Sequence, residues 1–174
     1  NGFSINKKTG KKIIGLVVVH TFGNLVNLDK NFIKFFKYKN IKIIEDAAES
    51  LGSFYIKNNK KIHPGTISDY GCLSFNGNKI ITSGGGGMII FKDKKNWEKA
   101  TYLSSQAKDD STYFIHNEVG YNFRMSDLHS SIGHAQLSNL HKVLKKKKLI
   151  HKFYKDKIKK IEGLKILENP NYCN

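Results

Sequence analysis

Two short apolar runs, separated by one helix-length segment, constrain the fold of this chain most strongly. Residues 13–20 read IIGLVVVH and residues 41–46 read IKIIED, and both are rich in the β-branched residues that favour strands. Continuous apolar runs of this length are typical of strands buried on both faces. Between them, residues 28–38 place aromatic residues among lysines, with Asp29 as a candidate N-cap, which predicts a short helix. This order predicts a parallel crossover unit in an α/β sheet.

The pattern continues downstream with further strands and helices. Apolar runs at 70–75 and 87–91 predict a third and a fourth strand, and LKIL at 164–167 predicts the start of another. Residues 57–69 are polar and predict a loop. Helices are expected at 94–103 and, from apolar spacings of three and four, across 126–160, with a polar loop between them.

The composition argues against several classes of protein. The net charge is +16, but Arg124 is the single arginine among 30 basic residues, and nucleic-acid surfaces rely on arginine for bidentate contacts. The lysines, including the run at 145–148, therefore predict solvated surface. Cys72 and Cys173 and the seven histidines show no metal-ligand or disulfide spacing. No apolar stretch is long enough to cross a membrane, so we expect a soluble protein of the reducing cytoplasm, with no metal site.

An acid and an amine stand near the ends of two of the expected strands. Asp46 ends its run at the carboxyl edge, where open α/β sheets bind ligands. By itself, this carboxylate could cap a helix over AAESLG, bind a metal, act as a base or pair with a cationic ring nitrogen. Lys79 is one lysine of many, but strand and turn residues flank it rather than other charges. Together, the pair suits pyridoxal chemistry, in which a lysine binds the cofactor as an imine and a carboxylate keeps the pyridine nitrogen protonated.

Two neighbouring features extend this hypothesis. Ser74 precedes Lys79 by five residues and could donate its hydroxyl to a phosphate. The glycines at 84–87 fit neither GxxxxGK[ST] nor a helix-opening GxGxxG, so they predict a tight turn rather than a nucleotide loop. The chain also lacks the GxSxG elbow of a serine hydrolase.

Three consecutive segments carry a family resemblance. IIEDAAESLGS at 43–53, GTISDYGCLSFNGNKIITSGGGGMI at 65–89 and GYNFRMSDLHSSIGHAQL at 120–137 resemble the signature blocks of the DegT/DnrJ/EryC1/StrS aminotransferases, in the family's order. The resemblance implies a pyridoxal-phosphate enzyme of the aspartate-aminotransferase fold that aminates keto sugars carried on nucleotides. The segment 74–88 is similar to the branch that acts on UDP- or GDP-linked 4-keto-6-deoxy sugars in bacillosamine, legionaminic acid and perosamine pathways.

The resemblance also implies roles for five residues. Lys79 matches the lysine that binds the cofactor covalently, Asp46 the aspartate on the pyridine nitrogen, and Ser74 the serine on the cofactor phosphate. Asn122 matches an asparagine that reaches the cofactor of a neighbouring subunit, which implies a homodimer with shared sites. Glu49 stands where many members have a glutamine on the phenolic oxygen, and a carboxylate there would be repulsive unless one group is protonated.

The resemblance further implies how the chain is organised. The expected fold class is α/β: the central part of the large domain of a fold type I pyridoxal-phosphate transferase, with a mixed, mostly parallel sheet and flanking helices. We expect residues 1–125 to form part of the cofactor-binding large domain, 126–162 a long linking helix and 163–174 the start of a small C-terminal domain. The family's upstream phosphate loop, its ring-stacking aromatic residue and most of the small domain have no match, so the chain alone is expected to be inactive.

The implied activity is transfer of an amino group, from glutamate, to a nucleotide-linked keto-deoxy sugar for surface polysaccharide, such as lipopolysaccharide, or other glycan biosynthesis. Two alternatives remain. One is a catalytically silent relative with a binding or regulatory role, against which the intact set of Asp46, Ser74 and Lys79 speaks. The other is a lysine-rich nucleic-acid-binding domain.

Overall fold

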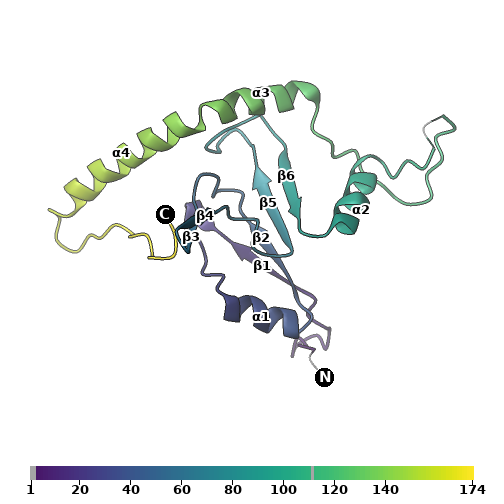
Figure 1. The fold of residues 1–174 in the computed structure, drawn as a ribbon, viewed down its shortest axis with the longest axis horizontal. Helices are drawn as coiled ribbons and strands as arrows, with labels where there is room; N and C mark the ends of the chain where they lie inside the picture. Colours follow the sequence, from purple (N-terminus) through teal and green to yellow (C-terminus); the bar gives the residue numbers. More distant parts are fainter. Residues whose placement is uncertain (1–2, 111) are drawn as a thin grey trace.

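A four-stranded sheet forms the centre of the computed structural model, in the order β1-β2-β5-β6 (Figure 1). The structure describes residues 3–110 and 112–174; residues 1–2 and 111, part of the expected 1–125 segment, lie outside the described residues. Strand β1 pairs parallel with β2, β2 parallel with β5, and β5 antiparallel with β6. The elements in chain order are β1 (Gly15–Val19), the 3₁₀ turn η1 (Thr21–Gly23), α1 (Lys30–Tyr38), β2 (Lys42–Asp46), β3 (Tyr55–Lys57), β4 (Lys60–Ile62), β5 (Tyr70–Ser74), β6 (Gly87–Phe91), α2 (Lys94–Ser104), α3 (Asp127–Ser138) and α4 (Leu140–Ile158). The expected mixed, mostly parallel sheet with flanking helices is confirmed.

The predicted crossover unit is present as β1–α1–β2. Asp29 caps α1, because its Oδ1 accepts hydrogen bonds from the backbone N–H groups of Asn31 and Phe32, each at 2.8 Å. The apolar side of α1 packs on a buried cluster that includes Val18 and Ile43 from the two strands. Burial of this apolar stripe, more than helix propensity, holds a nine-residue helix in place.

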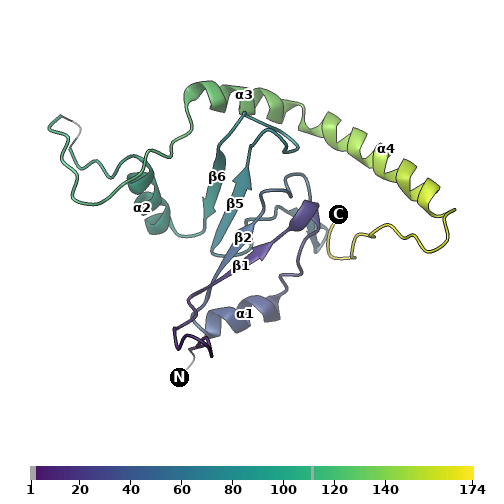
Figure 2. The same ribbon diagram turned by 180° about the vertical axis from the view of Figure 1, so that it is seen from behind.

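The opposite face of the sheet is open, which corrects one expectation. Strand β1 was predicted to be buried on both faces, yet Val17 and Val19 are 56% and 50% exposed. Side chains alternate along a strand, so α1 covers Leu16 and Val18 while Val17 and Val19 face the other way. Within the described residues, helix α1 covers this part of the sheet on one face only, with α1 far from the arc of α3 and α4 (Figure 2).

A β-hairpin, β3–β4, occupies the segment expected to be only a loop. Strands β3 and β4 pair antiparallel through a two-residue turn, Asn58-Asn59. Both asparagines have left-handed backbones, with φ of 50° and 58°, as tight hairpin turns require. Asparagine tolerates this conformation better than most residues, so the Asn-Asn pair was the available sequence signal.

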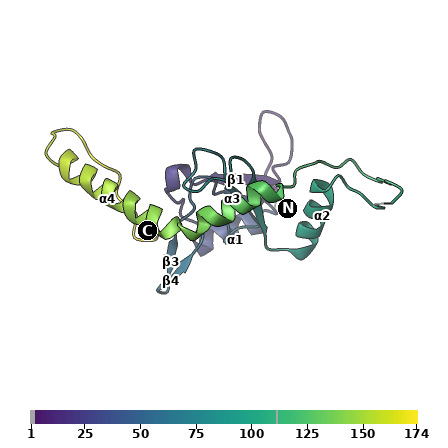
Figure 3. The ribbon, with the colours of Figure 1, turned by 90° about the horizontal axis from the view of Figure 1, so that it is seen from above.

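Helices α3 and α4 pass over the end of the sheet where β2 and β5 finish. The helical segment predicted at 126–160 is divided at Asn139, whose φ and ψ are −100° and 0°. Leu144 lies against Gly52, and Met125 lies against Gly86. Viewed from above, α3 crosses the sheet and α4 continues beyond it (Figure 3). No helix in the described part of the chain is long and apolar enough to span a membrane.

The last twelve residues contain no strand, so the strand expected at 164–167 is wrong. Figure 1 shows the chain looping away from the end of α4 before it returns to the body of the molecule. Among the described residues, no strand pairs with residues 164–167. The chain end instead lies beside β3, where Ile56 N–H donates to the Tyr172 carbonyl oxygen at 2.8 Å and Asn174 N–H to that of Phe54 at 2.9 Å.

Candidate active site

Asp46 and Ser74 end two neighbouring strands on the same face of the sheet. Asp46 is the last residue of β2 and lies opposite Cys72 of β5, and Ser74 follows Cys72 by two positions. Because side chains alternate along strands, all three share one face. That face is the open one, since Asp46 follows Glu45, which shares the covered face with Val18. A carboxylate and a hydroxyl therefore meet the open face at the carboxyl edge of the sheet.

The turn after β2 shows that Asp46 is not a helix cap. No helix forms over AAESLG; residues 48–49 form a turn, closed by a hydrogen bond from Ser50 N–H to the Ala47 carbonyl oxygen at 3.1 Å. Asp46 Oδ1 accepts from the N–H of Ala48 at 3.1 Å. The turn holds the carboxylate at the strand end and leaves it half-buried, in a position to contact a ligand on the open face.

Lys79 and Glu49 form an ion pair beside this strand end. Lys79 Nζ lies 3.3 Å from Glu49 Oε1, and the Lys79 side chain is only 16% exposed. The lysines of the other ion pairs are 29% to 81% exposed. Lys79 follows β5 in a turn in which its own N–H donates to the Asn76 carbonyl oxygen at 3.1 Å. The local fold therefore shelters this lysine more than those others.

Glu49 is ionised, and a backbone group is the first reason. Its Oε2 accepts from the N–H of Phe22 at 2.9 Å, and this bond, followed by that from Lys79, lowers the pKa of the Glu49 carboxyl. Phe22 has a left-handed backbone, with φ of 54° and ψ of 27°, which is unusual for a bulky residue. Strained backbone conformations of this kind are concentrated at functional sites. The sequence carried no signal for Phe22, because its contribution comes from the backbone.

A buried pair, His20 and Glu45, lies on the covered face of the sheet, behind the strand end that carries Asp46. His20 and Glu45 are fully buried, with His20 Nε2 3.1 Å from Glu45 Oε2. His20 Nδ1 accepts from the N–H of Val26 at 3.3 Å, so Nε2 is the ring nitrogen that donates to Glu45. Burial alone would raise the pKa of Glu45, but hydrogen bonds from His20, Gly65 and Ser68 outweigh it and lower the pKa to about 2. This pair was not predicted from the sequence, in which the adjacent acids Glu45 and Asp46, on opposite faces of one strand, were the available signal.

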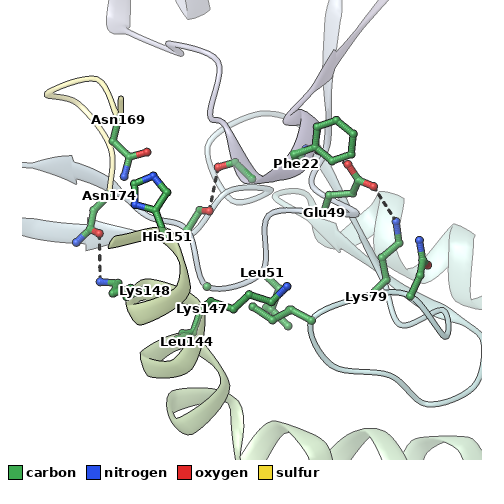
Figure 4. Close-up of a pocket in the computed structure, with 15 residues that line it drawn as sticks. Phe22, Glu49, Leu51, Lys79, Leu144, Lys147, Lys148, His151, Asn169 and Asn174 are labelled. Carbon is green, nitrogen blue, oxygen red and sulfur yellow. Dashed lines mark hydrogen bonds and ion pairs between the residues drawn. The ribbon is translucent and has the colours of Figure 1, made fainter. Parts of the chain in front are cut away.

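A cavity of about 740 Å³ opens between the sheet edge and α4. Phe22, Glu49 and Lys79 line one side, and residues of α4 line the other (Figure 4). Its size is within the range of small-molecule sites. Among the described residues, no group of three or more His, Cys, Asp or Glu side chains is placed to hold a metal ion.

The remaining predicted features lie around this cavity or away from it. The glycine run makes the expected tight turn into β6, with left-handed backbones at Gly84 and Gly86. A side chain at Gly86 would also collide with Met125. Asn122 is exposed and forms an isolated bridge with Ser105, in the excursion that leaves the sheet after α2. The structure therefore brings Glu49 and Lys79 together and places Asp46 and Ser74 on one face, but it does not bring Asn122 to them.

The structure is that of an α/β protein with a sheltered lysine–glutamate ion pair and a cavity at the edge of a mixed sheet. The model of the DegT/DnrJ/EryC1/StrS aminotransferase family matches residues 4–172, and the chain belongs to this family. The expected resemblance is thereby confirmed.

Two curated relatives and one solved structure illustrate the match. The chain is 35% identical to "Putative pyridoxal phosphate-dependent aminotransferase EpsN" of Bacillus subtilis over 167 residues, which are 96% of this chain and 41% of the relative. It is 32% identical to GDP-perosamine synthase of Escherichia coli O157:H7 over 88% of this chain and 41% of that enzyme. The crystal structure of the aminotransferase TlmJ from Streptoalloteichus hindustanus superimposes with a TM-score of 0.85 at 25% identity, covering 97% of this chain and 45% of TlmJ. The expected fold class is confirmed, and the chain spans about two fifths of the length of these curated relatives.

Proposed function

We propose that this chain forms the cofactor-binding part of a pyridoxal-phosphate-dependent aminotransferase. The enzyme moves an amino group from glutamate to a nucleotide-linked keto-deoxy sugar, in the biosynthesis of lipopolysaccharide or another surface glycan. The observation that carries the proposal is the sheltered Lys79, set beside the strand ends that present Asp46 and Ser74. The names of two relatives, a pyridoxal-phosphate-dependent aminotransferase and a GDP-perosamine synthase, support the cofactor and the substrate class.

The residues at the site suit pyridoxal phosphate. This edge of the sheet offers an amine, a carboxylate and a hydroxyl, which are the groups needed for a covalent anchor, a cationic ring nitrogen and a phosphate. When bound, the cofactor supplies an electron-accepting ring that weakens the bonds at the carbon bearing the amine. Lys79 would hold the cofactor and, once released, carry a proton between substrate and cofactor. Asp46 would keep the ring nitrogen protonated, and Ser74 would donate to the phosphate.

Glu49 has a different role from the glutamine that it replaces. Its lowered pKa keeps it ionised, and it faces Lys79 Nζ rather than offering a donor to a phenolic oxygen. An ionised carboxylate repels an anionic ligand oxygen. We therefore assign Glu49 to positioning Lys79 before the cofactor arrives.

A trapping experiment tests the assignment of Lys79. The complete protein, loaded with pyridoxal phosphate and reduced with borohydride, should carry the cofactor on the peptide that contains Lys79, as located by mass spectrometry. Lys79→Ala should lose the visible absorption band of the bound cofactor, whereas Lys145→Ala, on the exposed run of α4, should keep it. Cofactor trapped on another lysine would refute the assignment. Bound cofactor without glutamate-dependent spectral change would indicate the silent relative, and salt-sensitive DNA retention without cofactor would indicate the nucleic-acid-binding alternative.

The proposal includes a homodimer in the cytoplasm. Asn122 lies off the site of its own chain, on an exposed excursion, which suits a residue that reaches the cofactor of a second subunit. The two cysteines are free, as in a reducing compartment. A molar mass of one subunit, measured by sedimentation of the cofactor-loaded protein, would contradict the shared site.

A further inference from the structure

The side of α4 that faces the cavity is basic rather than apolar. Four of its residues, at positions i, i+3, i+4 and i+7, line the cavity: Leu144, Lys147, Lys148 and His151. This spacing defines one face of a helix. Of these four side chains, only Leu144 packs as an apolar residue would, against Gly52. The lysine run is exposed throughout, as expected, and the helix divides it, because Lys147 and Lys148 line the cavity and Lys145 and Lys146 do not.

The charges on the cavity wall favour an anion. Three lysines and one glutamate line it, and that glutamate, Glu49, already pairs with Lys79. Figure 4 shows Lys147 extending into the space between α4 and Lys79, while Lys148 lies beside Asn174, to whose side-chain oxygen it donates at 3.4 Å. The two lysines of α4 therefore add positive charge that no acidic side chain on the wall offsets.

The cations on the cavity wall suit phosphate groups. Lysine binds phosphate as a point charge, and two adjacent lysines with a histidine one turn further suit a ligand that carries charge on two neighbouring phosphates. The volume of about 740 Å³ also exceeds what an amino acid needs and accommodates a nucleotide-sized ligand.

We propose that Lys147, Lys148 and His151 of α4 bind the diphosphate group of the nucleotide-linked substrate. This inference rests on the proposed function and assigns the part of the site that holds the non-reacting end of the substrate. In this arrangement α4 holds the diphosphate on one wall of the cavity, and the sugar extends toward Lys79 on the opposite wall.

The matched variants come from the same run of four lysines. Lys147→Ala/Lys148→Ala removes the two lysines that line the cavity, and Lys145→Ala/Lys146→Ala removes two that do not, with the same loss of charge. Binding of UDP and GDP to the cofactor-loaded protein is measured by calorimetry at low and at physiological salt. We expect the first variant to weaken binding by about tenfold or more and the second by about twofold at most, with a smaller salt dependence in the first.

Separate readouts distinguish this inference from the proposed function. The cofactor absorption band and its change on adding glutamate report on the enzyme, and both should persist in the two double variants. Equal weakening by the two double variants would show a general charge effect and overturn the inference. Unchanged nucleotide binding in Lys147→Ala/Lys148→Ala, or a loss of glutamate response in that variant alone, would also overturn it, the second by showing that these lysines serve the amino donor.

Discussion

Replacement of Glu45 by glutamine should remove a pH-dependent part of the stability of this fold. The folded-state pKa of Glu45 is about 2, against a usual value of 4.5. A depressed pKa stabilises the folded state above the usual pKa, and that stabilisation is lost as the pH falls from about 4.5 toward 2. The difference corresponds to about 3 kcal/mol at pH 7, of which about 2 kcal/mol is lost by pH 3.

The structure explains why glutamine cannot substitute for this carboxylate. Glu45 Oε1 accepts from Ile67 N–H at 2.9 Å and from both Ser68 N–H and Ser68 Oγ at 2.8 Å, and Oε2 accepts from Gly65 N–H at 2.8 Å and from His20. All these neighbours donate. In Glu45→Gln, an NH₂ donor takes the place of one carboxylate oxygen and faces groups that are themselves donors. Those buried donors then lack an acceptor at every pH.

Urea unfolding at pH 7 and at pH 3 measures both effects. At pH 7 the free energy of unfolding of Glu45→Gln should be lower than that of the parent protein by about 3 kcal/mol or more. At pH 3 this difference in unfolding free energy should be smaller by about 2 kcal/mol. Glu98→Gln, at an exposed position of α2, is the control and should show no such narrowing. A gap that is constant between the two pH values would refute the reasoning, because it would mean that the charge on Glu45 contributes nothing.

Two further substitutions test the site and the sheet. Glu49→Gln should strengthen the binding of pyridoxal phosphate, measured by titration. The substitution removes a negative charge beside an anionic ligand and keeps an oxygen that can accept from the Phe22 N–H. Unchanged or weaker cofactor binding would contradict this electrostatic argument. Gly71→Ala should lower the free energy of unfolding by about 3 kcal/mol, because the added Cβ would overlap the backbone of Gly65. The control, Gly77→Ala, places its Cβ in open space and should have a melting temperature close to that of the parent protein. Equal melting temperatures for the two variants would show that the turn at Gly65 moves freely.

The crossover unit and the main strands were predictable because local patterns specify them. The run at 41–46, the N-cap Asp29 and the apolar residues of α1 act through short-range rules of burial and capping. The β3–β4 hairpin and the strand wrongly expected at 164–167 were not predictable in the same way. Short strands depend on a partner, and pairing is decided by segments distant in the sequence.

The identity of the site residues could be predicted from the sequence, but the contacts between them could not. The resemblance pointed to Asp46, Glu49, Ser74 and Lys79, and the structure places these four at one edge of the sheet. It could not show that Glu49 pairs with Lys79, because thirty residues separate them and the intervening chain folds into a hairpin and a strand. The contribution of Phe22 could not be predicted, because the group that donates to Glu49 is its backbone N–H rather than its side chain.

The sequence by itself determined the crossover unit and the main strands and helices, which family the chain resembles, and which chemical groups are available. The tertiary structure decided where those groups point. Neighbouring acids 45 and 46 take opposite faces of β2, so that one becomes a buried support and the other meets the open face. In the same way, α4 turns two of four consecutive lysines toward the cavity. The physical reason is common to both: strand and helix periods assign each residue to a face, and only packing against distant segments decides which face is buried.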